Sequence, residues 1–138
     1  MKKITRAGSM SLLLAACFAC TAWAEDKAST VPVIFARGAS VATLKGSLAG
    51  YESVNYVLRA KAGQALTVKI SGDRNANFNV FAPGDAPGSA AAIGRGSVGL
   101  DWSGATPTTG DYTIQVFQMR ASARRAAKAT YTVTTEIH

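Results

Sequence analysis

A strand, a basic loop and a second strand follow one another within residues 110–137, and this stretch constrains the fold more than any other. Before the loop, Tyr112, Ile114 and Val116 alternate with more polar residues, and a similar alternation resumes after it. Period-two alternation rich in β-branched and aromatic residues is typical of a half-buried strand. The sequence therefore predicts one hairpin with a basic loop between its strands. We call this loop, residues 118–128, the basic finger.

The basic finger carries four cations and no acid. They are Arg120, Arg124, Arg125 and Lys128, and they stand among alanines and a serine. The planar guanidinium group pairs bidentately with carboxylates or phosphates. A narrow arginine loop therefore fits a cleft lined by carboxylates, such as the cleft in which a glycosidase holds its paired catalytic acids. A charged loop is also commonly just a solvated surface, and both interpretations stand at this point.

The rest of the chain predicts further short strands. Turn residues recur every 8–12 positions and no helix is convincing, which predicts an all-β fold, an antiparallel β-sandwich of about eight strands. Before the finger, strands are expected at 31–36, 41–48, 54–59, 66–71, 77–81 and 98–102, with a hairpin turn at 61–64 and a possible helical turn within 121–128. The expected core is Ile34, Leu48, Tyr56, Leu58, Leu66, Val68, Ile70, Phe78, Val80, Leu100, Trp102, Tyr112, Ile114, Val116, Tyr131 and Val133.

The first residues have the features of a targeting segment. A positively charged start precedes a short apolar run at 11–19, and Ala22-Trp23-Ala24 is a small-x-small cleavage site. The sequence thus predicts a secretory signal peptide at 1–24, a polar leader at 25–30 and a β-sandwich domain at 31–138. The alternative is lipidation at Cys17, because residues 14–17 (Leu-Ala-Ala-Cys) match the pattern at which bacteria cleave and lipidate a cysteine. Both routes lead to export. The apolar run is too short to be a transmembrane segment.

Residue types that common catalytic and metal sites need are scarce. The only histidine is the terminal His138, and cleavage after Ala24 would remove both cysteines. This argues against a zinc site, a Ser–His pair or a Cys–His pair, so we expect no enzymatic activity, no cofactor and no metal. The chain has 15 cations and 8 acids, and three of those cations lie in the signal peptide. The remaining charge is modest and does not indicate a nucleic-acid partner.

Two local features need a separate interpretation. Residues 94–99 match the pattern Gly-x-Gly-x-x-Gly, but a dinucleotide site needs a strand before and a helix after. Here a Pro/Gly loop precedes and a strand is expected to follow, so we expect a flexible turn. Tyr51 follows Gly50 in a turn outside the strand alternation. It either folds over the end of the sandwich or serves as an exposed interface anchor.

With these residues the chain resembles the periplasmic inhibitors of g-type lysozyme, over about 31–137. The most specific parts are Gly50-Tyr51 with Tyr56, the run 60–64, and Gly110-Asp111-Tyr112 through Gln118-x-Arg120-x-x-Ala123-Arg124. The resemblance implies an antiparallel β-sandwich whose loops at one end insert into the substrate cleft of a g-type lysozyme. By the same resemblance, the lysozyme-binding residues would be Tyr51, Arg120 and Arg124, with Arg125 and Lys128 as neighbours on the same loop.

Two other functions stay open. Residues 56–68 and 110–112 also resemble small β-sandwich modules appended to secreted peptidases, which bind substrate or stabilise a partner. Such modules normally follow a catalytic domain, whereas this one directly follows the signal peptide. The third option is that the basic finger binds an acidic polysaccharide or a lipid head group.

Overall fold

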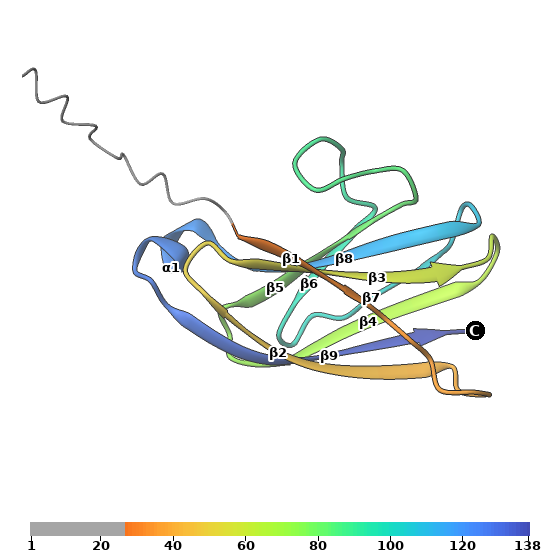
Figure 1. Cartoon of the computed structure of the whole chain (residues 1–138), viewed down its shortest axis with the longest axis horizontal. Coiled ribbons are helices and arrows are strands. Elements are labelled where there is room, and N and C mark those ends of the chain that lie inside the picture. Colours follow the sequence, from red (N-terminus) through yellow and green to blue (C-terminus); the bar gives the residue numbers. More distant parts are fainter. Residues whose placement is uncertain (1–26) are drawn as a thin grey trace, which may run out of the picture.

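The computed structural model describes residues 27–138, which form two β-sheets stacked face to face (Figure 1). Within that part of the chain the elements are β1 (Ala28–Pro32), β2 (Val41–Ala49), β3 (Ser53–Ala60), β4 (Ala65–Gly72), β5 (Ala76–Phe81), β6 (Gly94–Ser97), β7 (Trp102–Ala105), β8 (Gly110–Gln118), α1 (Arg120–Arg124) and β9 (Lys128–Ile137). The predicted all-β sandwich is therefore confirmed. The signal peptide and the alternative lipidation at Cys17 lie outside the described residues.

Sheet A has the strand order β1-β3-β8-β5-β6, and sheet B has the order β2-β9-β4-β7. All pairings are antiparallel except the one between β1 and β3, which is parallel. Most consecutive strands lie in different sheets, so the chain repeatedly crosses from one layer to the other at the two ends of the sandwich. These crossings gather several connecting loops at each end, and one end carries the basic finger (Figure 1).

The predicted hairpin around the basic finger is wrong. Strand β8 pairs with β3 and β5 in sheet A, whereas β9 pairs with β2 and β4 in sheet B. The finger is thus a bridge over the end of the sandwich, long enough to span the roughly 10 Å between two stacked sheets. The turn at 61–64 crosses between the sheets in the same way, although Gly63 has the expected positive φ, at 80°.

Most of the predicted core is confirmed, because the inward residues of β3, β4, β5, β8 and β9 pack between the sheets. Ile34 is an error, since its exposed fraction is 80%. The first strand is β1, which ends at Pro32, and Val33 rather than Ile34 then turns toward the core. Residues 28–30, which we had assigned to a polar leader, belong to this strand and pair with β3.

The strand expected at 98–102 is also wrong. The chain instead forms β6 and β7, joined by a tight turn in which Ser97 and Leu100 exchange backbone hydrogen bonds. Leu100 lies in this turn and is 59% exposed, and Trp102 is only partly buried, packed against the core. Of the glycine-rich run, residues 94–97 form strand β6 rather than the expected flexible turn, and Val98 and Gly99 form the turn that follows. Glycine in this strand makes room for aromatic rings. A Cβ at Gly96 would collide with the ring of Phe78.

A buried pair of tyrosines links the two sheets through their side chains. The hydroxyls of Tyr56 in sheet A and Tyr131 in sheet B are 2.8 Å apart and hydrogen-bonded, with the rings edge to face. A Cβ at Gly46 would lie 2.8 Å from the Tyr56 hydroxyl and closer still to that of Tyr131, so the glycine leaves space for the pair. Burial, and then the hydrogen bond and charge of Tyr56, raise the pKa of Tyr131 well above its usual range.

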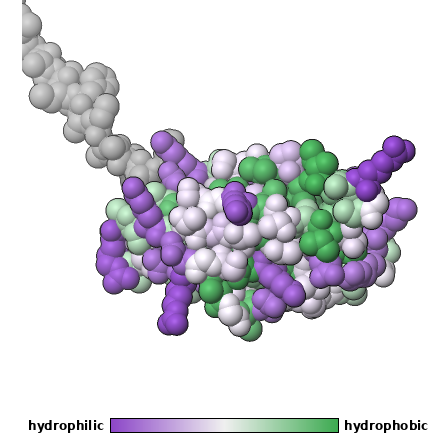
Figure 2. Space-filling model, turned by 90° about the horizontal axis from the view of Figure 1, so that it is seen from below, coloured by the Kyte–Doolittle hydropathy of each residue, from purple (hydrophilic) through white to green (hydrophobic). Residues whose placement is uncertain are grey.

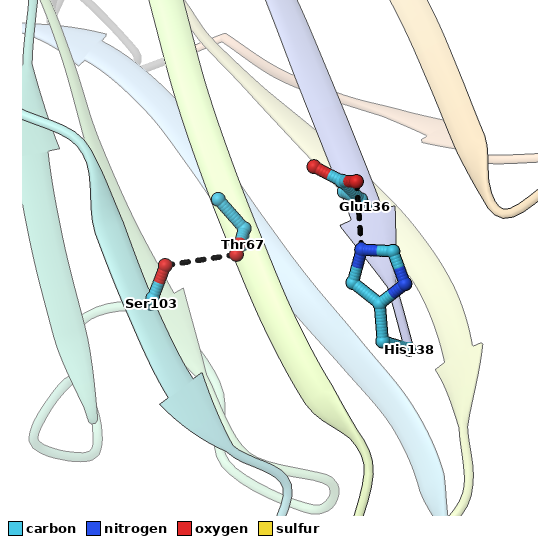
Figure 3. Close-up of polar contacts among 4 residues, drawn as sticks. All are labelled: Thr67, Ser103, Glu136 and His138. Carbon is cyan, nitrogen blue, oxygen red and sulfur yellow. Dashed lines mark hydrogen bonds and ion pairs between the residues drawn. The ribbon is translucent and has the colours of Figure 1, made fainter.

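The outer face of sheet B is a polar surface. Its outward positions on β9 include Thr130, Thr132 and Thr134, with Lys45 of β2 beside Thr132 and Lys69 of β4 beside Thr134. Seen from the side of β2 and β9, it is largely pale with separate hydrophilic chains (Figure 2). At the end away from the finger, the hydroxyls of Thr67 and Ser103 are 2.8 Å apart, and the His138 ring is 2.7 Å from the Glu136 carboxylate (Figure 3).

Candidate functional site

The basic finger has a defined backbone conformation. Its helix α1 spans only Arg120–Arg124, and the chain leaves it through two backbone hydrogen bonds, from Ala126 to the carbonyl of Ala123 and from Ala127 to that of Ser122. This is the Schellman pattern, which usually has glycine at the left-handed position. Ala126 takes that position with φ of 53°. A non-glycine residue is held there at an energetic cost, so the finger is shaped by its surroundings.

The finger is tied to the neighbouring turn that carries Tyr51. The backbone N–H of Gly50 donates to the Ala127 carbonyl over 2.9 Å. The buried side chain of Gln118 donates from Nε2 to the same Ala127 carbonyl over 2.7 Å and to the Gly50 carbonyl over 3.3 Å. On the inner side of α1, Ser122 and Ala123 are buried. Three hydrogen bonds and this packing hold the turn and the finger together as one unit.

Tyr51, Arg120 and Arg124 line one open concavity of about 470 Å³, together with Phe117, Gln118 and Met119. Tyr51 is 40% exposed. Both arginines are exposed, and within residues 27–138 neither forms an ion pair. Their guanidinium groups are therefore available for an external acceptor.

The other cations of the finger are more peripheral. Arg125 ends α1 and Lys128 begins β9, and both are exposed, but neither lines the concavity. The structure thus brings together three of the four candidate residues and leaves Arg125 beside them.

The site is suited to binding. Among residues 27–138 no group of three or more His, Cys, Asp or Glu side chains is arranged to hold a metal ion. No helix in that range is long and apolar enough to cross a membrane. What the concavity offers is two guanidinium groups, a phenol and apolar surface from Phe117 and Met119. Such a combination of arginine and aromatic anchors is typical of the centres of protein–protein interfaces.

The sequence reasoning missed Phe117, Gln118 and Met119 as lining residues. Phe117 stands on the outward side of the strand alternation, where a large aromatic ring is itself a signal of a binding surface. Gln118 was also informative, because it puts an amide at the inward position where the alternation calls for an apolar residue. Nothing in the pattern singled out Met119, which is 58% exposed.

The fold and this site define a class: a small β-sandwich that presents a cationic loop of defined conformation at one end. A scan against protein-family models finds no match. The sequence is 33% identical over 129 residues to the inhibitor of g-type lysozyme from Escherichia coli (strain K12), covering 92% of this chain and 93% of that protein. The chain belongs to the family of g-type lysozyme inhibitors.

Solved structures agree with this assignment. The crystal structure of PliG from Aeromonas hydrophila, a periplasmic inhibitor of g-type lysozyme, is 57% identical, with a TM-score of 0.80 over 82% of this chain and 99% of that one. These relatives are inhibitors rather than enzymes, in line with the expectation for this chain. The pre-peptidase C-terminal domain of a Bacillus anthracis collagenase, at 13% identity and a TM-score of 0.58 over 80% of this chain and 96% of that one, shares the fold alone.

Proposed function

We propose that this protein is a periplasmic inhibitor of g-type lysozyme that inserts its basic finger and Tyr51 into the substrate cleft of the enzyme. The observation that carries the proposal is the shared concavity of Tyr51, Arg120 and Arg124, in a chain whose relatives have this activity. The periplasmic location rests on the description of those relatives and on the predicted signal peptide.

The chemistry of insertion follows from the charges. A lysozyme cleft presents carboxylates that flank the scissile bond. Arg120 or Arg124 would donate charge-assisted hydrogen bonds to such a carboxylate and displace substrate and water. Because neither arginine has an ion-pair partner within residues 27–138, no internal salt bridge has to break first. Arg125, outside the concavity, would contact the rim of the cleft.

The finger also avoids much of the usual entropic cost of binding. Ordering a mobile loop on association reduces affinity. Here the hydrogen bonds from Gln118 and Gly50 fix the position of the finger relative to Tyr51 before any partner arrives. Binding would therefore require adjustment of side chains rather than folding of the loop.

The direct experiment is an inhibition panel. The exported form of the protein is mixed with g-type, chicken-type and invertebrate-type lysozymes while lysis of cell-wall suspensions is followed. We expect loss of g-type activity alone. Unchanged lysis by all three enzymes would reject the proposed function, and inhibition that also appears with other acidic-cleft enzymes would assign the finger to non-specific electrostatic binding.

The residue assignment has its own test. Arg120→Ala and Arg124→Ala should each weaken inhibition by about 2–4 kcal/mol, or roughly 30- to 1,000-fold in Kd, because each removes an arginine that binding would bury. Arg125→Ala should cost less, since rim contacts contribute little. The matched control is Lys69→Ala, which removes an exposed cation on the outer face of sheet B. Equal affinities for all four variants would remove the finger from the mechanism.

A further inference from the structure

A second surface lies on the outer face of sheet A, next to the finger. Five outward residues stand side by side across it, one from each strand, in the order Thr30, Asn55, Gln115, Asn79 and Arg95. We call this row the amide track. Neighbouring strands are about 4.8 Å apart, so the track is roughly 19 Å long. It offers neutral amide donors and acceptors along its middle and one cation at its β6 end.

The track borders two hollows that meet at Phe117. One hollow is lined by Asn55, Gln115, Phe117 and Gln118, with Tyr51 and Glu52 on one side and Ala86–Gly88 of the β5–β6 loop at its edge. It adjoins the concavity of the finger, which Tyr51, Phe117 and Gln118 also line. The other is lined by Asn79, Arg95 and Phe117 with neighbouring residues of β5 and β6. Figure 1 shows the β5–β6 loop rising above this face of the sandwich. Phe117 is the one residue that lines both hollows.

Two side-chain oxygens in this region lack hydrogen-bond partners. They are Asn55 Oδ1 and Gln118 Oε1, and within residues 27–138 no other buried side-chain nitrogen or oxygen is in this state. Both residues line the first hollow. Buried polar atoms in native proteins almost always have partners, so an unpaired one needs an explanation. For Asn55, a ligand that brings O–H or N–H donors into the hollow would provide it, after a rotation of the amide. The Gln118 amide keeps its orientation, because its Nε2 donates to the carbonyls of Gly50 and Ala127.

From these observations we propose that the amide track binds a chain of acetamido sugars, specifically the glycan of the bacterial cell wall. Sugar hydroxyls and acetamido N–H groups donate to unpaired amide oxygens, and amide N–H₂ groups donate to acetamido carbonyls. The apolar face of a pyranose ring packs on Phe117.

The cell wall is favoured over uncharged acetamido polymers by Arg95. This cation at one end of the track is exposed and can pair with carboxylates, which cell-wall glycan carries on its lactyl and peptide substituents. The choice of this glycan also rests on the proposed function, because the same polymer is what a lysozyme hydrolyses. Binding it would concentrate the inhibitor where the enzyme works, while Arg120 and Arg124, which line neither hollow, stay exposed.

The test is co-sedimentation with purified, protein-free cell-wall sacculi. Asn55→Ala combined with Gln115→Ala removes the centre of the track without touching the core, since both side chains point outward. Thr132→Ala combined with Thr134→Ala on the outer face of sheet B is the matched control. We expect roughly tenfold weaker binding of the track variant and unchanged binding of the control. Wild-type protein that stays in the supernatant, or equal binding of both variants, would overturn the proposal.

Three further measurements keep the outcome unambiguous. In the unmodified protein, the side-chain N–H₂ resonances of Asn55 and Gln115 should shift when a tetrasaccharide released from cell-wall glycan is added, and unshifted resonances count against the site.

Chitin beads serve as the uncharged polymer, and equal binding to chitin and sacculi would overturn the assignment to cell-wall glycan. Inhibition of g-type lysozyme is measured on the same variants with a soluble substrate. Lost inhibition without any sacculus binding would place the track in the protein interface instead, and unchanged inhibition with lost sacculus binding supports the proposal.

Discussion

At the scale of single residues, the hydroxyl pair of Tyr56 and Tyr131 is where the two sheets share a buried polar contact. Tyr131→Phe leaves the Tyr56 hydroxyl without its partner, which should cost about 1–3 kcal/mol of unfolding free energy. Adding Tyr56→Phe removes the stranded group and should recover most of that loss, because replacing both partners is nearly neutral. Urea unfolding of the single and double variants measures this. Strictly additive losses would show that the hydroxyls do not depend on each other.

The same pair predicts a dependence of stability on pH. The pKa of Tyr131 is raised in the folded state by burial and by Tyr56, whereas an unfolded tyrosine titrates near pH 10. Above about pH 10 the native state therefore binds more protons than the unfolded state, and stability falls as pH rises. The contribution is fully present below that pH. Urea midpoints from about pH 8 to 11 should fall more steeply for the wild type than for Tyr131→Phe. Parallel curves would exclude this residue as the cause.

At the scale of elements, Gln118 at the end of β8 connects the finger to the Tyr51 turn. Gln118→Leu keeps a side chain of similar size but leaves the carbonyls of Gly50 and Ala127 without their side-chain donor. We expect faster amide exchange in residues 119–127 and about tenfold weaker inhibition, because part of the binding energy must then order the finger. Hydrogen exchange followed by mass spectrometry checks the first effect. Normal exchange combined with weakened inhibition would instead indicate direct contact of Gln118 with the enzyme.

The elements also show what the sequence can predict. Period-two alternation in β4, β8 and β9 correctly identified strands and their buried faces, because it reports burial directly. It does not report which strand is the neighbour, so two strands joined by the finger were assigned to one hairpin although they lie in different sheets. The short glycine-rich strand β6 shows no apolar alternation, because its glycines have no side chains to bury. The space beside Gly94 and Gly96 is filled by the rings of Trp102 and Phe78 from neighbouring strands.

The candidate site, like the fold, could be predicted only in part from the sequence. The exposure of Tyr51 and of the finger arginines was open to sequence reasoning, because they stand outside the strand alternation. Their shared concavity was not, because it depends on β2 and β9 being neighbours in sheet B. That pairing brings Ala49, just before the Tyr51 turn, opposite Lys128 at the end of the finger. A residue pattern holds no information on such a pairing between segments far apart in the chain.

At the scale of the whole molecule, the sandwich separates the finger from the carboxyl terminus. Strand β9 begins beside the finger and runs for 10 residues, or about 30 Å, to the opposite end, where His138 pairs with Ala65 (Figure 1). A fluorescent protein fused after His138 should therefore leave inhibition of g-type lysozyme within about twofold of the unfused protein, since a difference of that size is well below the loss of one interface contact.

The same fluorescent protein inserted after Ala121, within α1, should abolish inhibition, because it separates Arg120 from Arg124 and blocks entry into a cleft. The sandwich should still fold, since α1 contributes little to the core beyond Ala123. The fluorescent domain reports the amount of each fusion, so activity is compared at equal concentration. If the carboxyl-terminal fusion lost inhibition while the Ala121 insertion kept it, the enzyme would have to bind at the end of the sandwich that carries His138, and the finger would be only a connection between the sheets.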